Sequence, residues 1–182
     1  FNVTEDADLG LRLAAFGYSS AMIPPPTLEE APVHWAQWLP QRTRWIKGHI
    51  LTLLVMMRQP IALIKSVGVF RFLGVQISFG ASVLSSLFHG PLTLLAITAA
   101  IMNPSVIATP YATVFALGYA SAIGAALIAR KYNTLSLSSI LTMPIYWPLH
   151  SIAGCAAIWE LFTRPYVWAK SDHGLDMPDQ SQ

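Results

Sequence analysis

The sequence predicts a mostly α-helical membrane protein, and its composition and charge distribution lead to this fold class. Apolar residues make up 54% of the 182 residues and charged residues only 11%, whereas about 25% of residues are charged in ordinary soluble domains. Residues 72–129 and 132–159 contain no Asp, Glu, Lys or Arg. Residues 1–71 mix acids and bases, as at the edge of a soluble domain. The net charge is +2 and the bases lie at the ends of apolar stretches, so we expect a membrane surface and no nucleic-acid partner.

The residues before the apolar stretches predict two helices and a short strand. Residues 7–16 form a helix whose apolar side chains share one face, and Gly17 supplies its left-handed end. Residues 18–23 read as a strand that ends at three consecutive prolines. Residues 33–58 read as a second helix, with a break or restart at Pro40. Its second half has the character of an interfacial helix, in which an apolar face is fringed by Lys47, His49 and Arg58.

The longer uncharged stretch can hold two membrane spans of about 20 residues each. We place one at residues 72–102, with a kink at residues 89–91, and the other at residues 111–129. Arg71 precedes the pair and Arg130 follows it, which puts both flanks in the cytoplasm. Residues 135–162 are interrupted by Pro144 and Pro148 and are expected to form a broken interfacial or re-entrant segment. The alternative is a division into four spans.

A first group of candidate site residues lies ahead of the first helix. Glu5 and Asp6 follow a strand-like approach, and a carboxylate held at a helix N-terminus can serve as a general base for a hydroxyl. The competing interpretation is an ordinary helix cap, with Asp8 and Arg12 paired four residues apart.

A second group lies in the longer helix. Gln41, Arg44 and Trp45 share one helical face and present an amide, a guanidinium group and a flat aromatic ring. Arginine matches diphosphate geometry through paired hydrogen bonds, and tryptophan offers a stacking surface for a sugar. The competing interpretation is an Arg–Trp cluster at a membrane boundary.

Together and in this order, the two motifs resemble those of family 2 inverting glycosyltransferases, the cellulose synthase-like membrane enzymes. The resemblance rests on Thr4-Glu5-Asp6 (TED) and on Gln41-Arg42-Thr43-Arg44-Trp45 (QxxRW). It continues in Glu29-Glu30-Ala31-Pro32, in Lys47-Gly48, and in a closing stretch at residues 164–174 that is similar to RPxxWxKTxHG, with Ser171 in place of Thr.

The resemblance implies a role for each matching residue. Asp6 would be the catalytic base and Glu5 would support its placement. Gln41 and Arg44 would hold the donor diphosphate, and Trp45 would stack under the acceptor sugar. Three further residues would correspond to a gating loop over the nucleotide: Trp168, Lys170 and Ser171.

The resemblance also implies a division of the chain and further components. Residues 1–60 would be the C-terminal part of a GT-A α/β catalytic domain, residues 61–164 the membrane region, and residues 165–182 the gating-loop-like stretch with a disordered tail. The family's metal and uridine residues lie upstream of TED, so we expect Mg²⁺ or Mn²⁺ with ligands mostly outside this chain. Asp6-Ala7-Asp8 spells DxD but overlaps TED and is interpreted as coincidence. The missing N-terminal catalytic half is therefore an expected partner, and this chain alone is expected to be inactive.

The expected function is processive transfer of sugar from a nucleotide sugar, a UDP-hexose above all, to a growing β-linked polysaccharide that crosses the membrane. The expected location is the cytoplasmic (inner) membrane, with the motifs facing the cytoplasm. Two alternatives stay open. One is a non-processive glycosyltransferase that acts on a lipid acceptor, and the other is a non-catalytic membrane anchor or partner subunit.

Overall fold

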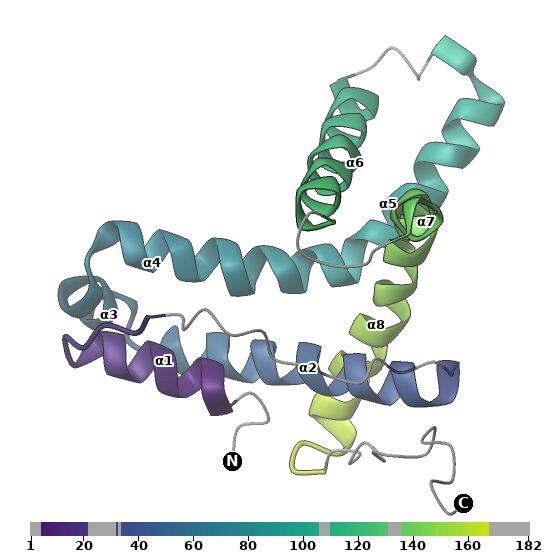
Figure 1. The fold of residues 1–182 in the computed structure, drawn as a ribbon. Helices are drawn as coiled ribbons and strands as arrows, with labels where there is room; N and C mark the ends of the chain where they lie inside the picture. The colour runs from purple at the N-terminus through teal and green to yellow at the C-terminus, as the bar shows by residue number, and fades with distance from the viewer. Residues whose placement is uncertain (1–4, 22–31, 33, 106–109, 131–135, 168–182) are drawn as a thin grey trace, which may run out of the picture. The chain divides into compact units, whose positions relative to one another are not determined.

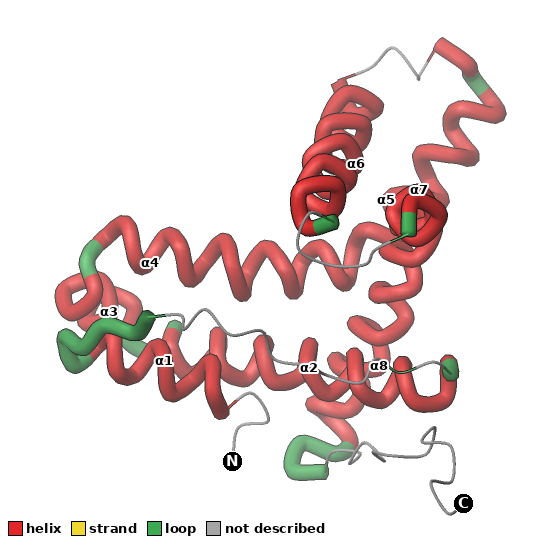
Figure 2. Tube along the Cα trace, in the orientation of Figure 1, coloured by secondary structure: helices red, strands yellow, loops and turns green. Residues whose placement is uncertain are grey.

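The structure is a computed structural model that describes residues 5–21, 32, 34–105, 110–130 and 136–167. Within these ranges the secondary structure is helical and contains no strand (Figures 1 and 2). The chain divides into two compact units, Phe1–Leu84 with Ala153–Gln182, and Ser85–Ile152. The mostly α-helical prediction is confirmed. The expected remnant of an α/β domain has no strand among the described residues.

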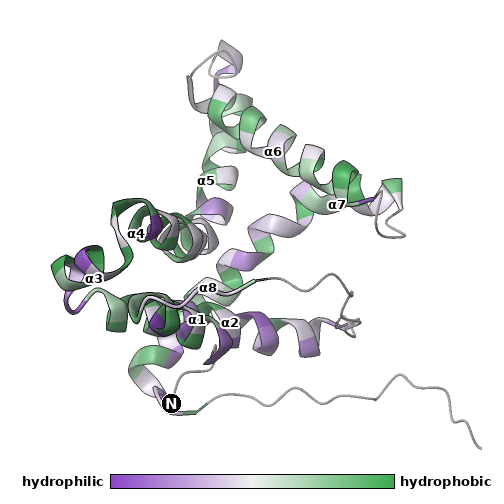
Figure 3. Ribbon diagram, turned by 60° about the vertical axis from the view of Figure 1, so that its left-hand side comes forward, coloured by the Kyte–Doolittle hydropathy of each residue, from purple (hydrophilic) through white to green (hydrophobic). Residues whose placement is uncertain are grey.

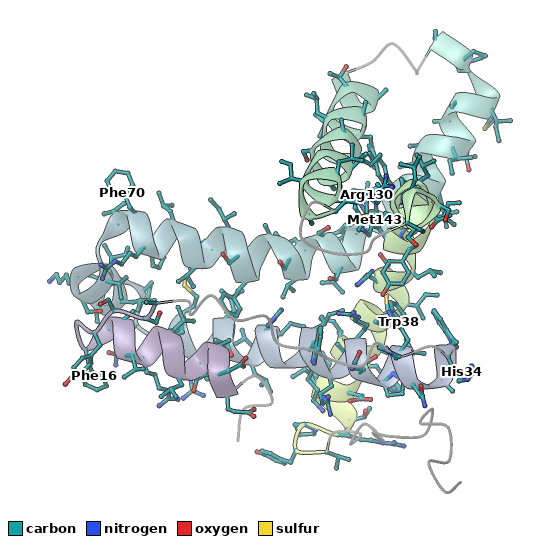
Figure 4. All side chains as sticks on the ribbon, in the orientation of Figure 1. Phe16, His34, Trp38, Phe70, Arg130 and Met143 are labelled. Atoms are coloured by element: carbon teal, nitrogen blue, oxygen red, sulfur yellow. The ribbon has the colours of Figure 1, made fainter. Side chains whose placement is uncertain are left out.

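Helix α1 (Glu5–Ala15) begins two residues before the predicted start. It ends as predicted at Gly17, whose φ is +86°. The Tyr18 N–H donates to the Leu13 carbonyl at 2.9 Å and the Gly17 N–H donates to the Ala14 carbonyl at 3.1 Å. This pattern closes the last turn through a left-handed residue, for which glycine carries no Cβ penalty. The apolar face of α1 is not buried, since Phe16 is 79% exposed and points away from the ribbon (Figure 4).

The predicted strand after α1 is wrong for the residues that the structure describes. Residues 18–21 have no regular secondary structure, and the rest of the predicted strand lies outside the described residues. A strand needs a neighbour to pair its backbone groups, and the described residues contain no other strand that could pair with it.

Helix α2 (Trp35–Met56) is continuous through Pro40, so the predicted break there is wrong. Pro40 is the sixth residue of the helix, so it removes one hydrogen bond of the helix without ending it. Helices α1 and α2 lie side by side in both views (Figures 1 and 3). The buried residues of α2 include Trp38, Ile46 and Ile50, which anchor it in its unit.

A sharp turn follows α2 and leads to the first candidate span. Helices α2 and α3 (Pro60–Val67) are bent by 90°. Gly68, with φ +85°, separates α3 from α4 (Val69–Val75). The helix then continues through a π-helical segment η1 (Gln76–Ala81) into α5 (Ser82–Met102). The π-helical turn accommodates one extra residue without ending the helix.

In the part of the chain that the structure describes, two helices are long and apolar enough to cross a membrane. They are Val69–Met102 and Ala112–Ala129, which lies in α6 (Pro110–Ala129), and in each only 6% of the apolar window is buried inside the protein. Figure 3 shows apolar residues along both. Apolar helices that the protein itself leaves uncovered are typical of lipid-facing segments. Helices α2 and α3 form a third span only if the bent pair crosses the membrane as one broken span.

The third apolar stretch is helical with an interruption near its prolines, and its interfacial or re-entrant placement stays a prediction. It forms α7 (Leu137–Tyr146), a short 3₁₀ turn η3 (Trp147–Leu149) and α8 (His150–Thr163). The turn begins after Pro144 and contains Pro148, each of which removes a backbone donor.

In the unit formed by residues 85–152, polar contacts join helices at the predicted kink. The Gly90 N–H donates to Ser151 Oγ at 2.8 Å, and His89 Nε2 lies 2.8 Å from the Tyr119 hydroxyl. The Tyr119 ring stacks on Trp147 with centroids 5.0 Å apart. Two of the residues that predicted a kink, His89 and Gly90, therefore contact other helices of this unit, while α5 itself runs unbroken through Pro91.

Candidate functional site

The predicted base lies in the first turn of α1. Glu5 and Asp6 are both exposed, and the first turn of α1 also contains Asp8. The free N–H groups of the first turn and the positive end of the helix dipole stabilise negative charge at the N-terminal end of a helix. Asp6 Oδ1 accepts a hydrogen bond from the Ala7 N–H at 2.8 Å. The carboxylate is thus oriented by the backbone and remains accessible to a substrate hydroxyl.

The Asp8–Arg12 ion pair, which the helix-cap interpretation predicts, is also present, and it does not involve the Asp6 carboxylate. Arg12 Nε donates to Asp8 Oδ2 at 2.8 Å. Asp8 is 9% exposed, so this pair is partly withdrawn from water. The two acids of the DxD spelling therefore have different environments, and only Asp6 presents its carboxylate to solvent.

The predicted diphosphate and acceptor residues occupy one helix, as expected. Gln41 and Arg44 are half-buried on α2 and Trp45 is exposed. Gln41 Oε1 is buried and has no hydrogen-bond partner among the described residues. A buried polar atom without a partner costs free energy.

Arg42, which the sequence interpretation gave no role, covers part of Trp45. Its guanidinium carbon lies 4.4 Å from the centre of the Trp45 ring. This cation–π contact occupies one face of the ring. If Trp45 stacks under a sugar, the opposite face is the one that remains for it.

His49 links the two motifs and was missed as a site residue. It lies one helical turn beyond Trp45 and packs edge-on against Phe79, with ring centroids 5.1 Å apart. Burial lowers the pKa of His49 from its ordinary value of 6.5, and the Asp6 carboxylate partly opposes that shift by raising it. Asp6 is therefore close enough to act on the α2 face just beyond QxxRW, in agreement with the purple N-terminal end of α1 beside α2 in Figure 1.

The predicted position of Lys47, at the solvated edge of an interfacial helix, is wrong. The sequence predicts it at the solvated edge of an apolar face, yet its side chain is 0% exposed. Its Nζ lies 3.3 Å from Glu160 Oε2 and donates to the Arg164 and Val167 carbonyls at 2.6 and 2.7 Å. The signal that could have revealed this is Glu160 itself, the single acid between Glu30 and Asp172.

The described residues do not supply a metal site. They contain no group of three or more His, Cys, Asp or Glu side chains that could hold an ion. The gating-loop candidates Trp168, Lys170 and Ser171 lie outside the described residues.

The described residues define a class: a helical protein with two helices long and apolar enough to cross a membrane, and a group of polar candidate residues on helices outside them. The family model described as "Glycosyl transferase family group 2" matches residues 1–159, which include both motifs. The chain belongs to this family and the protein is a glycosyltransferase. No curated protein and no solved structure matches the chain.

Proposed function

We propose that this chain carries the base and acceptor side of an inverting, processive glycosyltransferase of the cytoplasmic membrane. The donor would be a nucleotide sugar such as a UDP-hexose, and the acceptor the end of a growing β-linked polysaccharide. The single observation that carries the proposal is the match of residues 1–159, which contain both motifs, to the glycosyltransferase family.

The chemistry is a direct displacement. The Asp6 carboxylate takes the proton of the acceptor hydroxyl, and the hydroxyl oxygen attacks the anomeric carbon of the donor. The bond between that carbon and the diphosphate oxygen breaks, so an α-linked donor yields a β-linked product and a nucleoside diphosphate. The exposed position of Asp6 supports this role. Glu5, next to it, would help to place the carboxylate.

The developing charge on the leaving diphosphate needs positive partners. Arg44 would supply a guanidinium group, and Gln41 would donate the N–H groups of its side-chain amide. Trp45 would stack on the acceptor sugar through the ring face that Arg42 leaves open. Mg²⁺ or Mn²⁺ is expected from the family, with ligands outside the described residues.

The test uses the full-length enzyme in membranes and a panel of labelled nucleotide sugars. Asp6→Asn should reduce sugar transfer by at least about a hundredfold, because it removes general-base catalysis. Asp8→Asn is the matched control, since it also neutralises an acid of α1 and should stay within a few-fold of wild type. Retained transfer in Asp6→Asn would contradict the base assignment.

The same assay separates the proposal from a lipid acceptor and from a non-catalytic anchor. Long, enzyme-digestible β-linked chains are expected as the product. If the labelled product is instead a single sugar that extracts with lipid, the enzyme carries out a one-step transfer to a lipid acceptor and not processive synthesis. Membranes that contain the wild-type protein but transfer no sugar from any donor would contradict the proposed function as a whole.

A further inference from the structure

Helix α3 joins α2 to the first candidate span and has two different faces. Leu63 and Val67, four residues apart, are buried, and α3 packs against α1 and α4. Ile61 and Lys65, also four residues apart, lie on the opposite face and are exposed, Ile61 by 69%. One face of α3 therefore holds the helix in its unit, and the other presents an apolar side chain beside a base.

Three exposed bases lie in and next to α3. Arg58 follows the end of α2, Lys65 lies in the last turn of α3, and Arg71 lies in the first turn of α4. None of the three forms an ion pair with another described residue. The sequence contains no Asp or Glu between Glu30 and Glu160, and the acids of α1 lie in its first turn, at the end of that helix away from α3 (Figure 1). The described residues therefore leave this positive charge without a neutralising partner.

The helix dipoles favour two of these bases but not the third. A cation is stabilised at the C-terminal end of a helix, which suits Arg58 after α2 and Lys65 at the end of α3. Arg71 lies at the N-terminal end of α4, where the dipole favours negative charge and disfavours a cation. A negative group supplied from outside the described residues would offset this cost.

The surface next to the bases is apolar and continues into the first candidate span. Val69 and Phe70 directly precede Arg71 and are 58% and 90% exposed, and Phe70 points away from the ribbon in Figure 4. They begin the helix Val69–Met102, which is long and apolar enough to cross a membrane and has only 6% of its apolar window buried. Exposed apolar side chains beside unpaired bases, at the end of such a helix, fit the interface of a bilayer, where phosphates lie above the acyl chains.

We propose that Arg58, Lys65 and Arg71, together with the exposed face of α3, form a docking surface for the headgroups of anionic phospholipids where the first span enters the membrane. The bases bind the headgroup phosphates, and Ile61 and Phe70 insert among the acyl chains. An anionic lipid is preferred over a zwitterionic one because its headgroup carries no cation to repel the bases. The inference depends on the membrane placement of the chain and goes beyond the proposed function, since it assigns these residues no part in sugar transfer.

The experiment measures lipid binding by the detergent-solubilised full-length protein. The two ligands are a short-chain phosphatidylglycerol, which is anionic, and a phosphatidylcholine with the same acyl chains, which is zwitterionic. The wild type should bind phosphatidylglycerol with a Kd at least about tenfold lower. This preference should shrink at high salt, because exposed charges are screened. Equal affinities for the two lipids would overturn the inference.

Glutamine substitutions test whether these bases cause the preference. Arg58→Gln, Lys65→Gln and Arg71→Gln should each weaken phosphatidylglycerol binding about fivefold, the effect of one base near an anionic surface, and leave phosphatidylcholine binding unchanged. The triple variant should lose the preference. Arg130→Gln is the matched control, because Arg130 is an exposed base directly after α6, and it should stay within twofold of wild type. A wild-type preference in the triple variant, or an equal loss in Arg130→Gln, would contradict the assignment. If the triple variant fails to accumulate, the single variants decide by the same criterion.

Two further measurements distinguish a lipid from a free anion. Phe70→Ser should weaken the binding of both lipids by a similar factor, because it removes apolar contact and no charge. Inorganic phosphate shares the charge of a headgroup but has no acyl chain, so it should not displace phosphatidylglycerol at equal concentration. Unchanged lipid affinities in Phe70→Ser, or displacement by phosphate, would show that the surface binds free anions and not a lipid.

The outcomes also separate this inference from the proposed function, because lipid binding is measured without sugar transfer. A protein that prefers phosphatidylglycerol but transfers no sugar contradicts only the proposed function. An active enzyme without this preference contradicts only the docking surface.

Discussion

At the residue scale, the site depends on the different environments of neighbouring charges. Asp6 is exposed and Asp8 is paired with Arg12, although only one residue separates the two acids. His49 is half-buried, and burial lowers its pKa while the Asp6 carboxylate raises it in part.

The shifted pKa of His49 also gives the folded protein a pH dependence. Its pKa is lower in the folded chain than its ordinary value of 6.5, so the unfolded chain binds the proton more tightly. The contribution of His49 to stability is therefore fully present above pH 6.5 and is lost as the pH falls through the lower, folded value. Its partial exposure makes this contribution small.

The electrostatic influence of Asp6 on His49 can be measured by titration. Asp6→Asn should lower the pKa of His49 further, because it removes the negative charge that favours the imidazolium form. The measurement is a pH titration of the histidine resonances by NMR in the detergent-solubilised enzyme. Asp8→Asn should leave the pKa of His49 unchanged. An unaltered titration of His49 in Asp6→Asn would place the Asp6 carboxylate away from α2.

At the element scale, helix packing in the unit of residues 85–152 brings Gly90 close to Pro148 and Ser151. A Cβ at Gly90 would lie 2.8 Å from the Pro148 carbonyl oxygen and 2.9 Å from the Ser151 side chain. These neighbours are backbone and a short side chain, which cannot move aside easily. By contrast, a Cβ at Gly118 or Gly124 of α6 would meet nothing within 4 Å.

Gly90→Ala should therefore destabilise the protein by about 1–3 kcal/mol, the usual cost of overpacking. Gly124→Ala is the matched control and should be neutral or slightly stabilising, since alanine favours helix more than glycine does. Thermal unfolding of the detergent-solubilised protein measures both. Equal unfolding temperatures for the two variants would show that the Gly90 contact is not tightly packed.

At the scale of the whole molecule, the distribution of charge and apolar surface predicts how the chain crosses the membrane. The two candidate spans are apolar and largely uncovered by the protein. Exposed bases lie before the first span, at Lys65, and after the second, at Arg130. Two crossings would leave both on the cytoplasmic side, as the positive-inside rule favours.

Single cysteines should report this topology. Lys65→Cys and Arg130→Cys, in a background without reactive native cysteines such as the exposed Cys155, should react with an impermeant maleimide from the same side. His34→Cys, before α2, should react from that side too if the bent pair of α2 and α3 lies in the interface. Opposite labelling of residues 65 and 130 would instead support an additional crossing within Val69–Met102, and opposite labelling of residues 34 and 65 would make the bent pair a third span.

The sequence by itself determined the helical fold class, the end of α1 at Gly17, the two candidate spans and the broken third stretch. Each of these depends on local propensity or on runs of apolar residues, which are readable without knowledge of distant contacts. The motifs also indicated the glycosyltransferase family, to which the chain belongs.

Only the tertiary structure decided the environment of individual polar groups. Lys47 meets carbonyls and a carboxylate more than a hundred residues away in the chain, and Gly90 donates to Ser151 across 61 positions. No periodicity within α2 distinguishes a lysine at a solvated edge from one buried against another helix. The physical reason is that burial and hydrogen bonding depend on which elements pack together, whereas the pattern along one helix reports only which residues share a face.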